Sequence, residues 1–298
     1  MTMASGQTVL VTGATGRVGG QVAAQLTAAG DVRVRALSRH PATASADLGP
    51  DVEIVAGDLA VPETVTGALA GVDAVFLVFP TVTADAAARE LVTTLSRHVR
   101  RIVYLSAHGV PTVPDRRAEP DGGILGSHAH LEGLIAATAS EHTLLRASGF
   151  AANTLPWAAQ IRRSDVLRWI LPAAKRALIH EADVAAVGVL ALREDGHSGE
   201  AYHVTGPEQL TQVEQLAAIG EALGHPLRFE EINADEARTE LFPGLPAEVV
   251  AAIIAGQASM VEHPEPVTDT VARLTGRPAL TFAQWARDHA GDFARPTP

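Results

Sequence analysis

One stretch near the N-terminus decides the fold of this chain: Val9-Leu-Val-Thr-Gly-Ala-Thr-Gly-Arg-Val-Gly19. A short apolar run with β-branched residues leads into three glycines with G-x-x-G-x-x-G spacing, and the next residues have the apolar period of a helix. In such a strand–loop–helix, Gly13 makes the tight turn, Gly16 lets backbone amides approach a pyrophosphate, and Gly19 permits close packing. The stretch therefore predicts a dinucleotide site, and a purely structural turn is the alternative interpretation.

The first half of the chain alternates strand and helix patterns. The sequence predicts strands at 8–11, 32–37, 52–55, 73–78, 101–105 and 143–146, and helices at 17–29, 62–70, 84–98 and 125–138. This alternation is typical of a parallel sheet with helices on both faces.

The second half has fewer strands, predicted at 201–205 and 227–232, and more helix. Helices are expected at 183–192, with Asp183 as the N-cap, at 211–223, and through most of 234–293. We therefore expect an α/β chain with a Rossmann-type, doubly wound parallel sheet and a smaller mixed α/β C-terminal lobe. The expected domains are a nucleotide-binding domain at 1–153 and a substrate-binding lobe at 154–298, and the chain can re-enter the sheet near 179–205.

Composition excludes several classes of function. The 298 residues include no cysteine, which excludes disulfides, a cysteine nucleophile and an iron–sulfur cluster. The net charge of −11 argues against nucleic acid or an anionic membrane as a partner. No His, Asp or Glu cluster has the spacing of metal ligands, so no metal is expected. Neither Tyr104 nor Tyr202 is followed four residues later by the only lysine, Lys175, so a Tyr-x-x-x-Lys pair is absent.

The remaining expectations on location and assembly come from simple patterns. Residues 1–8 lack the pattern of a targeting segment, and no apolar run approaches the roughly 20 residues that span a bilayer. We therefore expect a cytoplasmic protein, and the composition, rich in Ala and Arg, favours a bacterial source. The expected partner is a small-molecule substrate, and the chain is either a monomer or a homodimer.

The second predicted strand indicates which dinucleotide binds. An NAD site usually places Asp or Glu about 20 residues after the first glycine, but Ser38 and Arg39 stand here instead. Together with Arg17, Arg39 supplies a second guanidinium that suits a 2′-phosphate, so we predict NADP(H). A solvated loop arginine is the alternative for Arg39. Asp58, followed by Leu59, is placed to meet the adenine, unless it only forms a turn.

Several motifs resemble one family. The glycine loop, Ser38-Arg39, Gly57-Asp58-Leu59 and the strand at 101–106 resemble the atypical short-chain dehydrogenase/reductases. The resemblance is strongest to the NmrA-like, NAD(P)H-binding subgroup, which includes bacterial NAD(P)H:quinone oxidoreductase type 2. It continues through His128-x-x-x-Glu132, the segments 145–153, 179–185 and 202–208, and residues 276–278, and so covers nearly the whole chain.

The resemblance implies a set of residues around the cofactor. Thr15 and Val18 of the glycine loop join the glycines and Arg17, Phe79 follows the fourth strand, and Leu105 and Ser106 lie near the nicotinamide ribose. At the nicotinamide end or the substrate pocket, the resemblance implies three further residues: Gly149, Phe150 and Asn153.

The sequence departs from most short-chain reductases where proton transfer is concerned. His128 and Glu132 stand in place of the usual Tyr and Lys, one helical turn apart on the same face. We expect the carboxylate to raise the pKa of His128, which suits a general acid, although a structural contact is the alternative. Ser106 is a candidate donor to a substrate carbonyl, unless it caps the backbone. The proline-rich segment 109–126 is expected to be a loop that covers the site as a lid.

These observations favour an NADPH-dependent oxidoreductase that delivers hydride to a quinone or another small conjugated carbonyl. Such an acceptor stabilises its own negative charge, so the absence of the Tyr/Lys pair is compatible with its reduction. Two alternatives stay open at this point. One is an NADP(H)-binding, redox-sensing regulatory protein without turnover, and the other is a biosynthetic isomerase or cyclase of the same fold.

Overall fold

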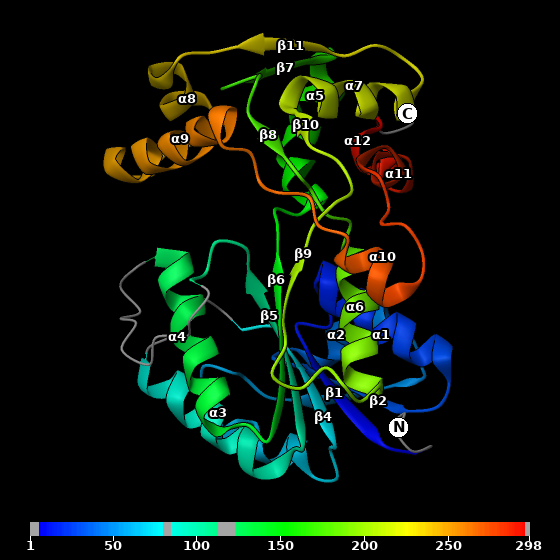
Figure 1. The fold of residues 1–298 in the computed structure, drawn as a ribbon. Helices are drawn as coiled ribbons and strands as arrows, with labels where there is room; N and C mark the ends of the chain where they lie inside the picture. The colour runs from blue at the N-terminus through cyan, green and yellow to red at the C-terminus, as the bar shows by residue number, and fades with distance from the viewer. Residues whose placement is uncertain (1–5, 80–84, 112–122, 296–298) are drawn as a thin grey trace. The chain divides into compact units, whose positions relative to one another are not determined.

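The strands predicted in the first half of the chain form one sheet in the computed structural model, which describes residues 6–79, 85–111 and 123–295. The sheet has seven strands in the order β3-β2-β1-β4-β5-β6-β9, and every pairing is parallel (Figure 1). Its strands are β1 (Thr8–Thr12), β2 (Arg33–Ser38), β3 (Val52–Ala56), β4 (Ala74–Leu77), β5 (Arg101–Ala107), β6 (Glu141–Ala147) and β9 (Ala201–Val204). The order reverses at β1, as in a doubly wound fold, so the predicted fold class is confirmed.

Helices cover both faces of this sheet. Helices α3 (Asp85–His98) and α4 (Gly123–Thr138) pack against each other on one face, and α1 (Arg17–Ala29) packs against α6 (Glu181–Arg193) on the other (Figure 1). The core beneath α3 and α4 is built from fully buried apolar side chains of the central strands and the two helices: Leu10, Val75, Leu77, Leu91, Leu95 and Ile135. The short helices α2 (Pro41–Leu48) and α10 (Thr270–Thr275) complete this part of the molecule.

The strands and helices divide between two compact units. The first unit comprises Met1–Ala147, Glu181–Val204 and Thr270–Arg277, and the second comprises Ser148–His180, Thr205–Asp269 and Pro278–Pro298. The chain therefore returns to the first unit with α6 and β9, and again with α10. The expected division into domains at residue 153 stays a prediction, because compact units do not by themselves define independently folding domains.

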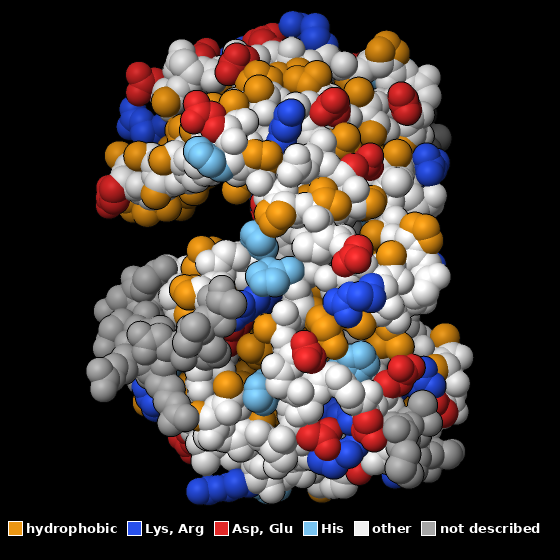
Figure 2. Space-filling view, viewed as in Figure 1, with side chains coloured by type: hydrophobic (Ala, Val, Ile, Leu, Met, Phe, Trp, Pro, Cys, Tyr) orange, Lys and Arg blue, Asp and Glu red, His pale blue; other side chains and the backbone are white. Residues whose placement is uncertain are grey.

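The second unit is mixed α/β. Two-residue pairing of β8 (Lys175–Arg176) with β10 (Leu210–Thr211) is antiparallel, and β7 (Val166–Trp169) pairs in parallel with β11 (Arg228–Glu231). The helical segments are η3 (Ala151–Trp157), α5 (Ala158–Ser164), α7 (Gln212–Leu223), α8 (Ala234–Glu240), α9 (Ala247–Glu262), α11 (Phe282–Asp288) and α12 (Ala290–Phe293). Buried aromatic side chains from η3, α11 and α12 form its core, and α9 exposes apolar side chains at the surface seen in Figure 2.

Three local expectations differ from the structure. Residues 62–70 form two short 3-10 turns, η1 (Pro62–Thr64) and η2 (Thr66–Leu69), instead of a helix. Asp183 is not an N-cap, because α6 begins at Glu181 and the completely buried Asp183 carboxylate pairs with Arg277 at 2.7 Å. Residues 123–126 of the predicted lid belong to α4, and most of the other lid residues lie outside the described residues.

Candidate functional site

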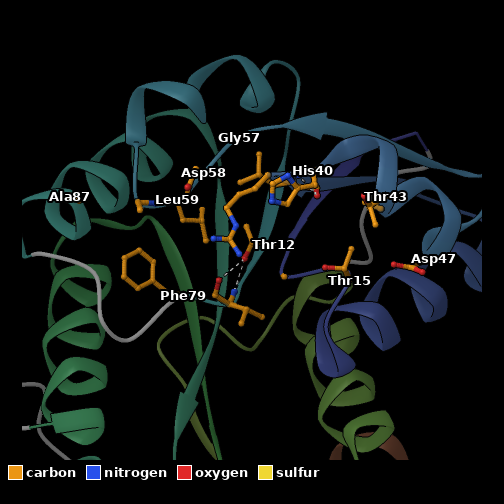
Figure 3. A pocket seen from close by; sticks show the side chains of 17 residues that line it. Thr12, Thr15, His40, Thr43, Asp47, Gly57, Asp58, Leu59, Phe79 and Ala87 are labelled. Carbon is orange, nitrogen blue, oxygen red and sulfur yellow. Dashed lines mark hydrogen bonds between the residues drawn. The ribbon is translucent and has the colours of Figure 1, made fainter. Parts of the chain in front are cut away.

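A cavity of about 910 Å³ opens in the first unit at the carboxyl ends of β1, β2, β3 and β4. Ligands of doubly wound sheets bind at this edge, beside the point where the strand order reverses. Side chains from these strand ends and from α2 surround the space in Figure 3. The lining is Thr12, Gly13, Thr15, Leu37, Ser38, Arg39, His40, Thr43, Ala44, Asp47, Gly57, Asp58, Leu59, Ala60, Val78, Phe79 and Ala87.

The glycine loop has the geometry that a dinucleotide phosphate requires. Gly13 has a φ of 62°, which only glycine adopts without strain, and it makes the turn out of β1. A Cβ on Gly19 would lie 2.6 Å from the carbonyl carbon of Gly13, so only glycine lets α1 approach the loop this closely. The residues present therefore fit the predicted role of the loop.

The N-terminus of α1 leaves backbone donors for a phosphate. The N-cap Gly16 has no side chain, and the first backbone bond runs from the Gly20 amide to the Gly16 carbonyl at 2.8 Å. The amides of residues 17–19 precede that bond, so they and the helix dipole face an incoming anion. Val18 and Gly19 are buried, whereas Thr15, Gly16 and Arg17 are exposed.

Thr12 joins the two central strands at the floor of the cavity. Its hydroxyl accepts a hydrogen bond from the Val78 amide at 2.7 Å and lies 3.0 Å from the Val78 carbonyl oxygen, to which it donates (Figure 3). Because the hydroxyl both accepts and donates a hydrogen bond, it holds the end of β4 beside the glycine loop. The expected cofactor residues Leu59 and Phe79 are buried in the same wall.

Two arginines, Arg39 next to Ser38 in the cavity lining and Arg17 at the start of α1, carry positive charge that no neighbour neutralises in the described part of the chain. Both are exposed, and neither has a hydrogen-bond or ion-pair partner among the described residues. Two uncommitted guanidiniums provide the bidentate donors that a phosphate group accepts.

Asp58 lines the cavity, but one oxygen of its carboxylate serves the local turn. Oδ1 accepts a hydrogen bond from the Ala60 amide at 2.9 Å, and the Asp58 amide donates to the Thr64 hydroxyl at the same distance. This bond fits the interpretation that Asp58 forms a turn. Contact of the second carboxylate oxygen with a nucleotide base stays a prediction.

A second polar group lies farther along the same sheet, beneath α4. The strand register places Ser106 of β5 beside Arg146 of β6, and Arg146 beside His203 of β9. Neighbouring residues in parallel strands share a face, so these three side chains form a row. His108, two residues after Ser106, extends the row, and its Nδ1 lies 3.3 Å from Nδ1 of His203.

Glu132 of α4 is the anionic centre of this group. Its carboxylate is completely buried, and it accepts hydrogen bonds from Ser106 Oγ at 2.5 Å and from Arg146 Nη2 at 2.6 Å. Arg146 Nε adds a third bond at 3.0 Å. The hydroxyl proton of Ser106 is therefore directed at Glu132, and the carboxylate is neutralised by Arg146.

The predicted partnership between His128 and Glu132 is not what the structure shows. Nδ1 of His128 lies 2.6 Å from the hydroxyl of Tyr104, and Glu132 contacts Ser106 and Arg146 instead. Burial lowers the pKa of His128 below its ordinary value, and the charge of Glu132 opposes this shift only in part. The expectation of a raised pKa is therefore wrong, because desolvation of the imidazole outweighs attraction to a carboxylate that Arg146 already neutralises. The catalytic roles of His128, Glu132 and Ser106 stay predictions.

The other expected cofactor residues lie in two places. Leu105 follows Tyr104 in β5 and does not line the cavity. Gly149, Phe150 and Asn153 belong to the second unit, where the Gly149 amide donates to Glu265 Oε1 at 3.3 Å. Phe150 is the N-cap of η3, and the Asn153 amide donates to the Phe150 carbonyl at 2.9 Å. Their contacts with a cofactor stay predictions.

Sequence reasoning missed three polar residues of the group beneath α4: Tyr104, Arg146 and His203. Tyr104 and Ser106 alternate along β5, so they share a face, and this period could have paired Tyr104 with the helix that carries His128. The register that aligns Arg146 and His203 with Ser106 depends on β9, which a strand pattern alone does not place.

Comparison with known proteins identifies the chain. A family model described as NAD(P)H-binding matches residues 13–195. The chain belongs to the NAD(P)H-binding family. It is 39% identical over 289 residues to a (4-alkanoyl-5-oxo-2,5-dihydrofuran-3-yl)methyl phosphate reductase of Streptomyces griseus, covering 96% of this chain and 99% of that protein. It is 33% identical over 287 residues to an NAD(P)H azoreductase of Xenophilus azovorans, with the same coverage. This member of the NAD(P)H-binding family is accordingly an NAD(P)H-dependent oxidoreductase.

Solved structures share the fold of this family member. An NADPH-dependent quinone oxidoreductase of Escherichia coli, solved with NADPH, has a TM-score of 0.75 at 24% identity and matches 94% of this chain and 99% of its own. A triphenylmethane reductase of Citrobacter has a TM-score of 0.76 at 20% identity, with 95% and 99% coverage.

Two further findings concern only the residues that the structure describes. They include no group of three or more His, Asp or Glu side chains that could hold a metal ion. None of their helices combines the length and apolar character that crossing a membrane requires.

Proposed function

We propose that this oxidoreductase prefers NADPH and reduces a small conjugated carbonyl, such as a quinone or an enone. The preference for NADPH is supported by Arg39, which stands where an NAD site usually has an acidic residue, and by Arg17 at the start of α1; neither guanidinium has a partner among the described residues. Gly13, Gly16, Gly19 and the first amides of α1 would hold the pyrophosphate, and the bound cofactor supplies a hydride.

The substrate proposal rests on the charge and protonation of the polar group beneath α4. Glu132 is ion-paired with Arg146, and burial, followed by the charge of Glu132, raises the pKa of Tyr104 far above its ordinary value. Burial lowers the pKa of His128 and so favours the neutral imidazole. The described site therefore lacks a strong proton donor, which a simple ketone needs and a conjugated carbonyl does not.

The nature of a relative's substrate supports the same class. The name of the Streptomyces griseus reductase describes a 2,5-dihydrofuran with a 5-oxo and a 4-alkanoyl group, in which a carbon–carbon double bond is conjugated with carbonyl groups. Hydride addition to such a double bond places the negative charge on a delocalised oxygen. This chain is proposed to act on an acceptor of that electronic type.

The test is steady-state oxidation of NADPH, followed by its absorbance, with a panel of acceptors. The panel contains a quinone, an enone, an unsaturated lactone, an azo compound and a plain ketone, each with NADPH and with NADH. We expect turnover with the conjugated acceptors and little with the plain ketone. No turnover with any conjugated acceptor, or efficient turnover with the ketone alone, would contradict the proposal.

A further inference from the structure

The hydrogen bond between Tyr104 and His128 has a definite direction. The Tyr104 side chain is completely buried, and its hydroxyl lies 2.6 Å from Nδ1 of His128. Within the described residues, this hydroxyl has no other hydrogen-bond partner. If it accepted a proton from Nδ1, its own O–H would be buried without an acceptor, and a lost donor costs more than an unused lone pair. Tyr104 is therefore the donor, and Nδ1 of His128 is the acceptor.

This direction determines the tautomer of His128. A neutral imidazole that accepts at Nδ1 carries its proton on Nε2. The described residues supply no hydrogen-bond partner for that nitrogen, and the imidazole is only half-buried. Burial favours the neutral imidazole, and it also keeps Tyr104 protonated, because it raises the pKa of the phenol. The pair therefore presents one fixed N–H donor.

Tyr104 lies on the strand next to β4, whose carboxyl end forms part of the cavity wall. Tyr104 is paired in register with Leu77 of the neighbouring strand β4, and Phe79, two residues farther on, lines the cavity. Tyr104 and Phe79 also belong to one buried cluster on the α4 side of the sheet. The Glu132 carboxylate is bound by Arg146 at 2.6 Å and by the Ser106 hydroxyl at 2.5 Å, so it is not the acceptor for a proton of the pair.

We infer that Tyr104 is a positioning residue that holds His128 as a neutral Nε2–H donor for the carbonyl oxygen of the substrate. The inference rests on the proposed reductase function. Addition of hydride to a conjugated carbonyl develops negative charge on that oxygen, and a preorganised N–H donor stabilises it without a proton transfer. Tyr104 and His128 both keep their protons, and the product takes its proton from solvent.

The first test reads the tautomer directly, without turnover. Long-range proton–nitrogen NMR spectra of the full-length ¹⁵N-labelled protein, compared with His128→Gln for assignment, should show His128 protonated at Nε2 in the wild type. In Tyr104→Phe, we expect a mixture of tautomers and a higher titration midpoint for His128. A wild-type His128 protonated at Nδ1, or a tautomer unaffected by Tyr104→Phe, would overturn the inference.

The second test is kinetic, with a quinone or an enone as the acceptor. Tyr104→Phe should lower kcat about 3- to 10-fold, as expected for one neutral hydrogen bond, with little change in KM for NADPH. The double variant Tyr104→Phe/His128→Ala should be no slower than His128→Ala alone, because both changes remove the same donor. Additive losses, or an unchanged kcat in Tyr104→Phe, would contradict the positioning role.

The chain contains a matched control for both measurements. Tyr202 is its only other tyrosine, and its hydroxyl lies 2.8 Å from Nδ1 of His197, in the same unit. Tyr202→Phe should leave the His128 tautomer and kcat unchanged. The NMR result also separates the two proposals: failure to reduce any carbonyl contradicts the proposed function, whereas the wrong tautomer contradicts the role of Tyr104.

Discussion

The side chains of Glu132 and Arg146 form a two-point ion pair that is almost completely removed from solvent. Arg146 Nη2 and Nε bond to different oxygens of Glu132 at 2.6 and 3.0 Å, and the two side chains are 0% and 1% exposed. The pair joins α4 to β6, and it is completed by the Ser106 hydroxyl and by the Pro111 carbonyl, which accepts from Arg146. Such a pair tolerates the loss of both charges far better than the loss of one.

Removing one member of this pair should therefore destabilise the protein strongly. We expect Glu132→Gln or Arg146→Met to lower the free energy of unfolding by about 3–5 kcal/mol, because each leaves an uncompensated buried charge or polar group. The double variant Glu132→Leu/Arg146→Met should lose less than either. Urea unfolding followed by circular dichroism measures all three, and a double variant with the summed loss would show that the two side chains do not act as a coupled pair.

The close contact between Gly19 and the loop predicts a specific loss of cofactor binding. In Gly19→Ala the new methyl group overlaps the Gly13 carbonyl, so the loop must move away from α1. We expect the affinity for NADPH, measured by fluorescence titration, to fall at least about tenfold. Gly67→Ala is the matched control, because a Cβ there meets nothing within 4 Å. Equal losses of NADPH affinity in the two variants would show that the glycine loop does not bind the cofactor.

Arg39 should determine the preference between the two nicotinamide cofactors. Losing a hydrogen bond to a charged group costs about 1.5–3 kcal/mol, so Arg39→Ala should weaken NADPH binding about 10- to 150-fold with little effect on NADH. Arg17→Ala should act in the same direction, but more weakly. Arg97→Ala removes an exposed positive charge from the end of α3 and is the control. A wild-type protein that binds NADH as tightly as NADPH would refute this assignment.

Half-buried histidines should make the protein less stable in mild acid. Burial lowers the pKa of His128, His142, His197 and His203, so between the two pKa values the unfolded chain binds more protons than the folded one. The free energy of unfolding should therefore fall as the pH drops below about 6.5, and this loss should end beneath the lowered values.

Urea midpoints at pH 7.5 and 5.5 measure this loss. His142→Gln should make the difference between the two midpoints smaller, because it removes one of the groups that titrate. His263 is exposed, so His263→Gln serves as the control and should leave the difference unchanged. A midpoint that is the same at both pH values in the wild type would contradict the role of the histidines.

Local patterns predicted the parts of the fold that local sequence determines. The glycine loop, α1 and the strands of the first half follow from glycine spacing and apolar period, and the helix expected at 211–223 is found as α7. The start of α6 was misplaced because Asp183, which suits an N-cap, is used for a long-range pair with Arg277. Sequence spacing does not show such a pair.

The candidate site was predictable to a similar extent. Seven of the expected cofactor residues line the cavity, because the carboxyl ends of parallel strands meet at one edge: Gly13, Thr15, Ser38, Arg39, Asp58, Leu59 and Phe79. Gly16, Arg17, Val18 and Gly19 are not part of this lining. The partners of His128 and Glu132 were not predictable, since helical spacing showed that these two residues are neighbours but not that Tyr104 and Arg146 satisfy them. Side chains of the sheet beneath a helix can bond to a helical residue in place of its neighbour on the helix.

The pairing of β6 with β9 limits how this protein can be shortened or recombined. A fragment that ends at residue 153 contains the whole glycine loop but lacks β9, so Leu144–Ala147 would become an open edge strand. Open edges recruit strands from other copies, and such a fragment should aggregate rather than serve as a portable nucleotide-binding module. Exchange of substrate-recognition segments between related reductases therefore has to replace internal stretches, such as the one between β6 and α6, and cannot simply swap a C-terminal tail.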